Sequence, residues 1–351
     1  MKKKILVTGG IGYIGSHTVV ELQQSGYDVV IVDNLSNSNI EVLDGIEKIT
    51  GIRPAFEQFD LCDAHKTMKF FDKNQNIDAI IHFAALKAVG ESVKLPLKYY
   101  ANNLNSTINL LNAMQQYKVK NFVFSSSCTV YGQPDILPVT EQAPIKKALS
   151  PYGNTKQIAE EMLQDSLEVN NNLAVIALRY FNPIGAHTSA LIGELPLGIP
   201  NNLVPFVTQT AAGLRSLLSV FGNDYDTPDG TCVRDYIHVV DLAKAHVIAV
   251  KRLLESKNKT AFEVFNLGTG NGNTVLDVIN TFEKVTGVKL NYKIVERRIG
   301  DIEKVWADTT FANNELGWKS QLSLGDALLS AWKWETEYRK RLDKQSYSNI
   351  G

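Results

Sequence analysis

The stretch VTGGIGYIG, residues 7–15, places four glycines within seven positions, directly after an apolar run. Gly10, Gly12 and Gly15 have the spacing G-x-G-x-x-G. Gly9, Gly12 and Gly15 have the related spacing G-x-x-G-x-x-G. With either spacing, one glycine permits a tight turn, one lets the backbone approach a pyrophosphate, and one lets a helix pack on a strand. The stretch therefore predicts a strand, a phosphate-binding turn and a helix N-terminus.

Short apolar runs rich in β-branched residues recur along the first half of the chain, each followed by a helical pattern. They lie at residues 4–9, 28–34, 55–61, 78–85, 121–127 and 173–182. Runs without alternation are typical of parallel strands buried on both faces and joined by crossover helices. The pattern predicts an α/β fold with a Rossmann-type doubly wound parallel sheet, followed by a smaller C-terminal α/β domain.

The rhythm of strands and helices breaks after Asn182. Residues 183–230 are rich in Gly, Pro and Asn, which predicts loops around one helix at about residues 204–213. A helical pattern returns at residues 239–256, a strand follows at 262–268, and a last helix is expected at 323–342.

Composition excludes several classes of protein. The 36 basic and 37 acidic residues nearly cancel, so the chain has no electrostatic footprint for nucleic acid or an anionic membrane surface. Cys62, Cys128 and Cys232 are far apart and odd in number, which supports neither a disulfide framework nor a zinc site. No apolar stretch approaches the ~20 residues that span a bilayer. We expect a cytoplasmic protein in a reducing compartment, with no nucleic-acid or membrane partner.

Asp33 closes the second apolar run, about 20 residues after the glycines, where a carboxylate accepts hydrogen bonds from an adenosine ribose. A carboxylate there repels a 2′-phosphate, and no arginine follows in VDNLSNSN. The cofactor predicted is NAD rather than NADP. The alternative, that Asp33 caps the turn into the next helix, is compatible with this role and stays open.

Two further sequences, FSSSCTVYG and SPYGNTK, carry candidate catalytic residues. The second sequence predicts a helix with Ser150 as its N-cap and Pro151 in its first turn. Tyr152 and Lys156 are four residues apart at the start of this helix, so both lie on one face. An ammonium close to a phenol stabilises the phenolate and lowers its pKa from ~10 toward neutrality. Ser127, at the end of the preceding strand, supplies a hydroxyl that can bond a substrate oxygen and relay a proton. A surface helix pair is the alternative for such spacing, and the glycine stretch favours catalysis.

Together with LRYFNPIGAH and VFGNDYDTPDGTCVRDYIHVVDLA, these sequences resemble the extended short-chain dehydrogenase/reductases that act on nucleotide sugars, and within them the UDP-glucose 4-epimerase family, over nearly the whole chain. The resemblance implies interconversion of UDP-glucose and UDP-galactose by reversible hydride transfer at sugar C4, through a 4-keto intermediate, with tightly bound NAD. It implies that Ser127, Tyr152 and Lys156 are catalytic.

The resemblance also implies binding residues. Those expected to contact NAD are Gly9, Gly12, Tyr13, Ile14, Gly15, Asp33, Asn34, Leu35, Asn37, Ser38, Asp60, Leu61, Phe83, Ala84, Lys87, Asn102, Tyr152, Lys156 and Phe181. Those expected to contact the UDP-sugar substrate are Ser127, Asn182, Asn202, Leu203, Phe221, Arg234, Tyr236, Arg298, Asp301 and Val305. No metal site is expected, because the histidines are scattered without ligand spacing.

The residue types agree with these roles. Arg234 and Arg298 are permanently charged and suit a diphosphate, while Phe221 and Tyr236 could flank a uracil ring; surface ion pairs are the alternative for each arginine. Val305 falls, by resemblance, where members restricted to non-acetylated sugars carry tyrosine, which implies room for an N-acetyl group. The alternative is that Val305 only packs against its neighbours.

The resemblance further implies an NAD-binding domain at residues 1–182 and a mainly UDP-sugar-binding domain at 183–351, with about 233–255 returning to the first. It implies a homodimer through the helices at 96–117 and 151–170, unless those apolar faces simply cover the sheet. Other nucleotide-sugar epimerases, reductases or dehydratases stay open as functions, and so does a non-catalytic NAD-binding regulator. Water loss is disfavoured because no carboxylate occurs in SSSCTVYG.

Overall fold

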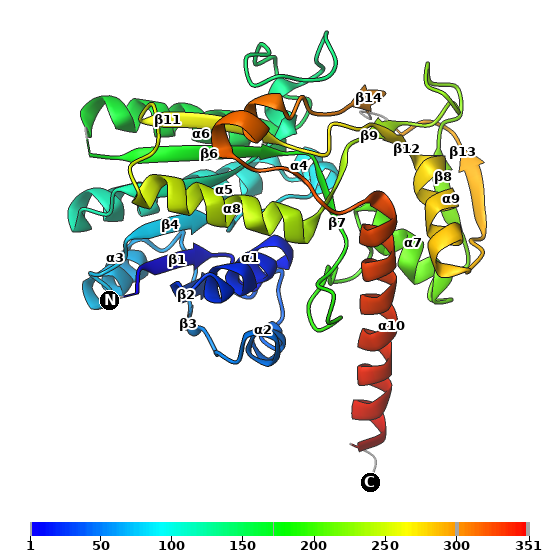
Figure 1. Ribbon diagram of the computed structural model, residues 1–351, viewed down its shortest axis with the longest axis horizontal. Coiled ribbons are helices and arrows are strands. Elements are labelled where there is room, and N and C mark those ends of the chain that lie inside the picture. The colour runs from blue at the N-terminus through cyan, green and yellow to red at the C-terminus, as the bar shows by residue number, and fades with distance from the viewer. Residues whose placement is uncertain (1, 171, 299–301, 349–351) are drawn as a thin grey trace.

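The computed structural model describes residues 2–170, 172–298 and 302–348, and its centre is a parallel sheet (Figure 1). The sheet has seven strands in the order β11-β6-β5-β4-β1-β2-β3. The strands are β1 (Lys4–Thr8), β2 (Asp28–Asp33), β3 (Ala55–Gln58), β4 (Ala79–His82), β5 (Asn121–Ser127), β6 (Ala174–Tyr180) and β11 (Phe262–Leu267). All neighbouring strands in it run parallel, which confirms the predicted doubly wound sheet.

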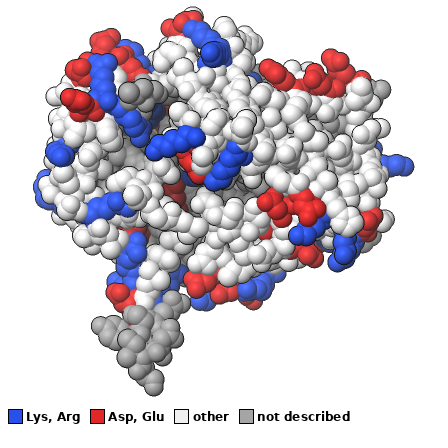
Figure 2. All heavy atoms as spheres, turned by 180° about the vertical axis from the view of Figure 1, so that it is seen from behind, with Lys and Arg blue, Asp and Glu red and all other residues white. Residues whose placement is uncertain are grey.

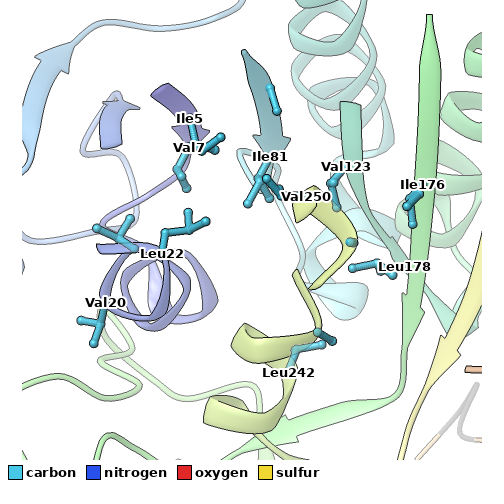
Figure 3. Close-up of a cluster of buried hydrophobic side chains, with 14 of the residues drawn as sticks. Ile5, Val7, Val20, Leu22, Ile81, Val123, Ile176, Leu178, Leu242 and Val250 are labelled. Carbon is cyan, nitrogen blue, oxygen red and sulfur yellow. The ribbon is translucent and has the colours of Figure 1, made fainter. Parts of the chain in front are cut away.

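Helices cover both faces of this sheet. On one face lie α1 (Tyr13–Gln24), α2 (Val42–Thr50) and α8 (Val239–Leu254); on the other lie α3 (Ala64–Lys73), α5 (Pro96–Tyr117) and α6 (Pro151–Val169), with the short α4 (Val89–Lys94) before α5. Successive side chains of a strand point to opposite faces. Ile5 and Val7 therefore pack with Leu242 on the α1–α8 side (Figure 3), whereas Leu6 packs with the helices opposite.

The order of the strands reverses at β1, which lies between β4 and β2. Ligands of doubly wound sheets bind in the crevice at such a switch point, beyond the carboxyl ends of the strands. Here the turn after β1 and the segment after β4 approach closely, since a Cβ on Gly9 would stand 2.8 Å from the Ala84 nitrogen. The fold thus prepares a site beside the glycine stretch.

The rest of the chain forms small sheets from very short strands. They are β7 (Asn182–Ile184) with β10 (Tyr236–His238), β9 (Val233–Arg234) with β12 (Asn273–Thr274) and β14 (Lys304–Val305), and β8 (Leu218–Phe221) with β13 (Tyr292–Val295). The prediction of loops around one helix across 183–230 is wrong at β7 and β8. Both strands pair with partners far along the chain, which local patterning does not reveal.

Three helices accompany these small sheets: α7 (Leu203–Ala211), α9 (Val275–Thr286) and α10 (Leu324–Ser348), with α10 extending away from the body of the molecule (Figure 1). A cluster including Val207, Phe282 and Leu328 packs them together. Short turns of 3-10 and π helix occur at Cys128–Tyr131 and Ala312–Leu316. No helix in the described part of the chain combines the length and the apolar character needed to traverse a membrane.

Candidate active site

The glycine stretch forms a turn between β1 and α1. Gly9 has a φ of 68°, which favours glycine, and its N–H donates to the Val32 oxygen at 2.8 Å. A Cβ on Gly15 would stand 2.2 Å from the Gly9 oxygen, so only glycine lets α1 pack this close. At Gly12 a Cβ would meet only the Gly9 oxygen within 4 Å, and no side chain caps the first turn of α1. The open turn and its N–H groups fit the phosphates of a dinucleotide.

Asp33 ends β2 beside this turn and is 8% exposed. Its Oδ1 accepts hydrogen bonds from the Leu35 nitrogen at 2.9 Å and the Ser38 hydroxyl at 2.8 Å. Burial raises the pKa of Asp33, and these hydrogen bonds oppose the rise. The turn-capping role that the sequence left open is therefore present. The place of Asp33 at the end of β2 also fits a ribose contact.

The other residues expected to contact NAD gather at the same edge of the sheet. Asn34, Leu35, Asn37 and Ser38 follow β2; Asp60 and Leu61 follow β3; Phe83, Ala84 and Lys87 follow β4; Asn102 lies in α5; Phe181 follows β6. Some of them bond one another, since Asn34 donates to the Asp60 carboxylate at 3.2 Å. Parallel strands bring these distant segments together at their carboxyl ends.

Ser127 and Tyr152 are brought together by the end of β5 and the first turn of α6. Ser150 caps α6 by accepting from the Gly153 nitrogen, and Pro151 follows as the first helical residue, as the sequence predicts. The Ser127 hydroxyl lies near the Tyr152 phenol and favours its ionised form, which opposes the larger rise in the pKa of Tyr152 caused by burial. The Ser127 Oγ also accepts from the Thr129 nitrogen at 3.2 Å and from its hydroxyl at 3.0 Å. These two bonds fix the position of the serine hydroxyl.

Lys156 lies in α6, one turn after Tyr152. Its ammonium donates to the Ser125 oxygen at 2.6 Å and lies 4.8 Å from the centre of the Phe124 ring. Burial lowers the pKa of Lys156 to about 8, and Glu160 opposes the fall. Burial also raises the pKa of Tyr152 to about 12. The expected shift of the phenol toward neutrality is wrong for the chain alone, because desolvation dominates and the ammonium bonds a carbonyl instead.

The structure adds residues that the sequence reasoning missed. The Ser125 hydroxyl bonds the Tyr180 hydroxyl. Behind it, Glu160 accepts hydrogen bonds from Arg179 and Ser126, all three being buried. Neighbouring positions on β5 and β6, such as Ser127 opposite Tyr180, follow from the pairing of the two strands. An alignment of FSSS with ALRY as adjacent strands could have placed Ser126 beside Arg179 and Ser127 beside Tyr180.

The residues expected on the substrate side lie along the small sheets. Asn182 and Tyr236 are paired between β7 and β10, and Arg234 is paired with Val305 between β9 and β14. Asn202 precedes α7, and Leu203 is its first residue. Asp301 lies outside the described residues.

Several of these side chains differ in exposure. Phe221 is 39% exposed, and the guanidinium of Arg298 lies 5.4 Å from the centre of its ring. Tyr236, by contrast, is buried among the helices of the C-terminal cluster. Val305 is 4% exposed and belongs to a cluster with Phe181, against which Cys128 packs. Val305 thus lies near the residue that follows Ser127.

On the face shown in Figure 2 the surface is hollowed near its centre, and lysine and arginine side chains stand around the hollow. Cationic groups around a recess suit an anionic ligand. Among the described residues, no group of three or more His, Cys, Asp or Glu side chains is arranged to hold a metal ion.

The parallel sheet, the glycine turn and the Ser127–Tyr152 pair beside Lys156 define a Rossmann-type enzyme of the dehydrogenase/reductase class. A family model described as GDP-mannose 4,6 dehydratase matches residues 6–329. A UDP-glucose 4-epimerase of Bacillus subtilis is 52% identical over 332 residues, which cover 95% of this chain and 96% of that protein. The chain belongs to the UDP-glucose 4-epimerases within that wider family.

Solved structures agree with this membership. A UDP-glucose 4-epimerase from Stenotrophomonas maltophila, with bound NAD and formylated UDP-arabinopyranose, has a TM-score of 0.93 and 49% identity, covering 97% of this chain and 99% of that one. A UDP-glucose 4-epimerase from Bifidobacterium longum, in complex with NAD+ and UDP, has a TM-score of 0.91 and 48% identity, covering 95% and 98% of the two chains.

Proposed function

We propose that this chain is an NAD-dependent isomerase that interconverts UDP-glucose and UDP-galactose by inverting the configuration at sugar C4. The observation that carries the proposal is the proximity of Ser127, at the end of β5, to Tyr152, in the first turn of α6, at the same carboxyl edge of the sheet as the glycine turn. The family membership agrees with it. Cys128 and Thr129 follow Ser127, so no carboxylate is adjacent there to promote the loss of water that a dehydratase needs.

The chain's own residues handle the proton. The Tyr152 phenol oxygen takes the proton of the sugar 4-hydroxyl and later returns it, and Ser127 holds that hydroxyl and relays the proton. The positive charge of Lys156, held on the same face of α6, would favour the phenolate by electrostatic attraction. Since burial raises the pKa of Tyr152 in the chain alone, bound NAD and substrate would have to supply the further stabilisation of the phenolate.

The glycine turn and Asp33 would hold NAD by its phosphates and its adenosine ribose, and Lys87 and Phe181 would make further contacts to it. Bound NAD would supply the acceptor for the hydride of sugar C4 and the donor for its return to the opposite face, together with a positive charge. On the substrate side, Arg234 and Arg298 bind the diphosphate, and Phe221 stacks on the uracil. The diphosphate stays held while the 4-keto sugar turns over between the two transfers.

The direct test is to incubate the purified protein with UDP-galactose, without added NAD, and to measure UDP-glucose. We expect conversion, because NAD that is regenerated in each cycle copurifies with the protein. The variant Tyr152→Phe should lose on the order of 10²–10⁴ in kcat with UDP binding nearly unchanged. Tyr292→Phe, on the distant strand β13 and 39% exposed, is the matched control and should keep full activity. A protein that converts UDP-galactose only with stoichiometric external NAD would contradict the proposal.

We further propose that UDP-N-acetylglucosamine and UDP-N-acetylgalactosamine are substrates. Val305 supports this, because it is much smaller than tyrosine and packs in the cluster that Cys128 borders. Removing a bulky ring relaxes a steric rejection. Val305→Tyr should suppress turnover of the N-acetylated pair while sparing the other pair. If the unaltered protein turns over neither N-acetylated sugar, another side chain closes the pocket.

The assembly and location of the protein are finer proposals. A homodimer is supported by exposed apolar side chains near α4 and α5, including Val93 at 61%, Leu97 at 79% and Ile108 at 41%. The opposite face of α5 covers the sheet, so the outer face is available. Light scattering at micromolar concentration should give twice the mass of one chain, and a monomeric mass would exclude the dimer. A cytoplasmic location is supported by the free thiols of all three cysteines.

The division into domains is also a proposal. The separate apolar cluster around α7, α9 and α10 supports a second domain after residue 182, and residues beyond that point that pack on the central sheet, such as Phe265 and Trp318, return to the first. The packing of α8 against the sheet supports the return of residues 233–255 to the first domain. Limited proteolysis between residues 183 and 203 should release fragments that match this boundary.

A further inference from the structure

Glu194 has a backbone that is fixed from several sides. Its oxygen accepts a hydrogen bond of 3.0 Å from the indole nitrogen of Trp334 on α10. A Cβ on the preceding Gly193 would stand 2.4 Å from the Cγ of the same indole, so the chain lies directly on the ring. Gly193 also forms an antiparallel bridge with Ala186. The direction in which Glu194 projects its side chain is therefore set.

The carboxylate of Glu194 holds two side chains from different parts of the chain. Its Oε1 accepts a hydrogen bond of 2.6 Å from the Asn202 amide and one of 3.3 Å from the Lys87 ammonium, which is 107 positions away. The Glu194 side chain is 13% exposed and that of Lys87 is 47% exposed. Asn202 precedes α7 but does not cap it, so its amide is oriented by Glu194 rather than by the helix.

Tyr13 completes the group around this carboxylate. Its hydroxyl donates to the Gly185 oxygen at 2.7 Å, and the Lys87 ammonium lies 5.9 Å from the centre of its ring. Burial raises the pKa of Tyr13, and the negative charge of Glu194 adds to the rise. Tyr13 and Lys87 are assigned to the cofactor, and Asn202 to the substrate. Glu194 is assigned to neither and contacts both sides.

We propose that Glu194 is a positioning residue that couples the cofactor side of the site to the substrate side. The inference rests on the proposed function for the roles of Lys87 and Asn202. One carboxylate oxygen holds both side chains, so ordering Lys87 on the cofactor reduces the conformational entropy that Asn202 still has to lose when the UDP-sugar binds. The backbone contacts to Trp334 provide the rigid support that such a residue needs.

The experiment uses the NAD-loaded protein and the variant Glu194→Gln, which keeps the shape but removes the charge. Loss of a charge-assisted hydrogen bond should raise the KM for UDP-galactose about tenfold, with kcat within about twofold of the original. The calorimetric Kd for UDP alone should rise likewise, and the fraction of NAD retained through long dialysis should fall. The matched control is Glu283→Gln on α9, since Glu283 is 15% exposed and also binds a lysine; it should change none of these values.

A double-mutant cycle separates coupling from a merely structural role. In an Asn202→Ala background, Glu194→Gln should raise the Kd for UDP by less than about twofold, because the group it positions is gone. Equal effects in both backgrounds would overturn the inference. So would a lower unfolding temperature without any change in KM, UDP affinity or NAD retention. A protein inactive on UDP-galactose would contradict the proposed function, while UDP affinity and NAD retention would still test Glu194.

Discussion

The central sheet and the small sheets of this molecule place their functional residues by different means. Around the large sheet, the backbone does most of the positioning: the Gly9 nitrogen bonds the Val32 oxygen, and the Phe83 nitrogen bonds the Thr8 oxygen at 3.0 Å. The carboxyl ends of neighbouring strands therefore lie at the same edge of the sheet, whatever side chains the strands carry. In this region, sequence patterns that specify backbone geometry also specify the site.

Among the small sheets, a buried side chain takes over that task. Asp235 is fully buried between Arg234 and Tyr236, and its carboxylate accepts hydrogen bonds from the backbone nitrogens of Thr269, Gly270 and Ala307. The strands in this region have only two to four residues, too few to fix one another through ladder bonds alone. The difference teaches that the substrate side depends on a few carboxylates, whereas the cofactor side depends on many backbone contacts.

The largest expected effect comes from removing that carboxylate. Asp235→Ala leaves several buried N–H groups without an acceptor, so the free energy of unfolding should fall by about 3–5 kcal/mol. Urea denaturation measures the loss. UDP affinity should decrease more than NAD retention, since the bonded segments flank Arg234 and Val305. Asp235→Asn keeps an acceptor oxygen for Thr269 and should lose less; equal losses of the two ligands would undermine the distinction between the regions.

The matching change in the sheet region is Gly15→Ala. The added Cβ meets the Gly9 oxygen at 2.2 Å, so either the turn or α1 must move, at a cost of about 3 kcal/mol. NAD content, measured after denaturing the purified protein, should fall while UDP binding to the remaining fold persists. Gly90→Ala is the control, because nothing lies within 4 Å of a Cβ there. Full NAD content in Gly15→Ala would show that the close packing of helix and turn is dispensable.

Acid should weaken the sheet region more than the small sheets, because three fully buried histidines lie in or against the central sheet, whereas His238 on β10 is the counterpart among the small sheets, with a pKa that burial lowers to about 4. Burial lowers the pKa of His82 on β4 to about 3, against an ordinary value near 6.5, so protonation favours the unfolded chain. The neutral ring costs no stability above pH 6.5, and the free energy of unfolding falls as the pH drops from 6.5 toward 3. At pH 5 the loss is about 2 kcal/mol. His17 and His246, on the helices packed against the same sheet, are shifted in the same direction by burial.

The measurement is the free energy of unfolding at pH 7 and pH 5 for the original chain and for His82→Gln. The variant removes one titrating ring, so its loss between the two pH values should be smaller by about 2 kcal/mol. Hydrogen exchange at pH 5 should show α1 and α8 opening before α9. An identical pH dependence in both proteins would mean that His82 is not held neutral.

The smallest effect concerns the start of α9. Thr274 caps this helix by accepting from the Asp277 nitrogen at 2.9 Å, while the Asp277 carboxylate accepts from the Thr274 nitrogen. The Thr274 hydroxyl also bonds Asp229. Thr274→Ala should cost about 1 kcal/mol, measured by urea denaturation, and Thr274→Ser should cost almost nothing because it keeps the hydroxyl. A serine variant as unstable as the alanine variant would assign the effect to the lost methyl group.

Sequence patterns predict most of the central sheet and the part of the site that lies along its edge. The run NFVFSSS becomes β5 over the same residues, and Ser150 and Pro151 begin α6 as expected, because strand burial and helix capping are local properties. The pairing of β8 with β13 and the carboxylate bonds of Asp235 were beyond such reasoning. These contacts join segments that are far apart in the chain. The hydrophobic periodicity of a sequence does not predict which distant residue a buried carboxylate will bond.

The charge state of the site was also beyond sequence reasoning. The spacing of Tyr152 and Lys156 puts both on one face of α6, but it does not show that the ammonium bonds the Ser125 oxygen. The balance between desolvation and attraction depends on how deeply each group is buried, which only the packed structure specifies. Asp33 is a contrasting example, because its role was predictable from the sequence. Both of its predicted roles, the cap of the following turn and the contact to a ribose, need only its position at the end of a strand.

The position of β11 at the edge of the central sheet bears on how the chain is made. Six of the seven strands are complete once residue 180 has been synthesised, but β11 spans Phe262–Leu267 and pairs with β6 in register from Val175 to Tyr180. The ribosome must therefore synthesise the segments between β6 and β11, which include several small-sheet strands, before β11 can pair with the free edge of β6. Until then the nascent chain exposes an unpaired apolar strand, the kind of surface that chaperones bind during slow, non-local folding.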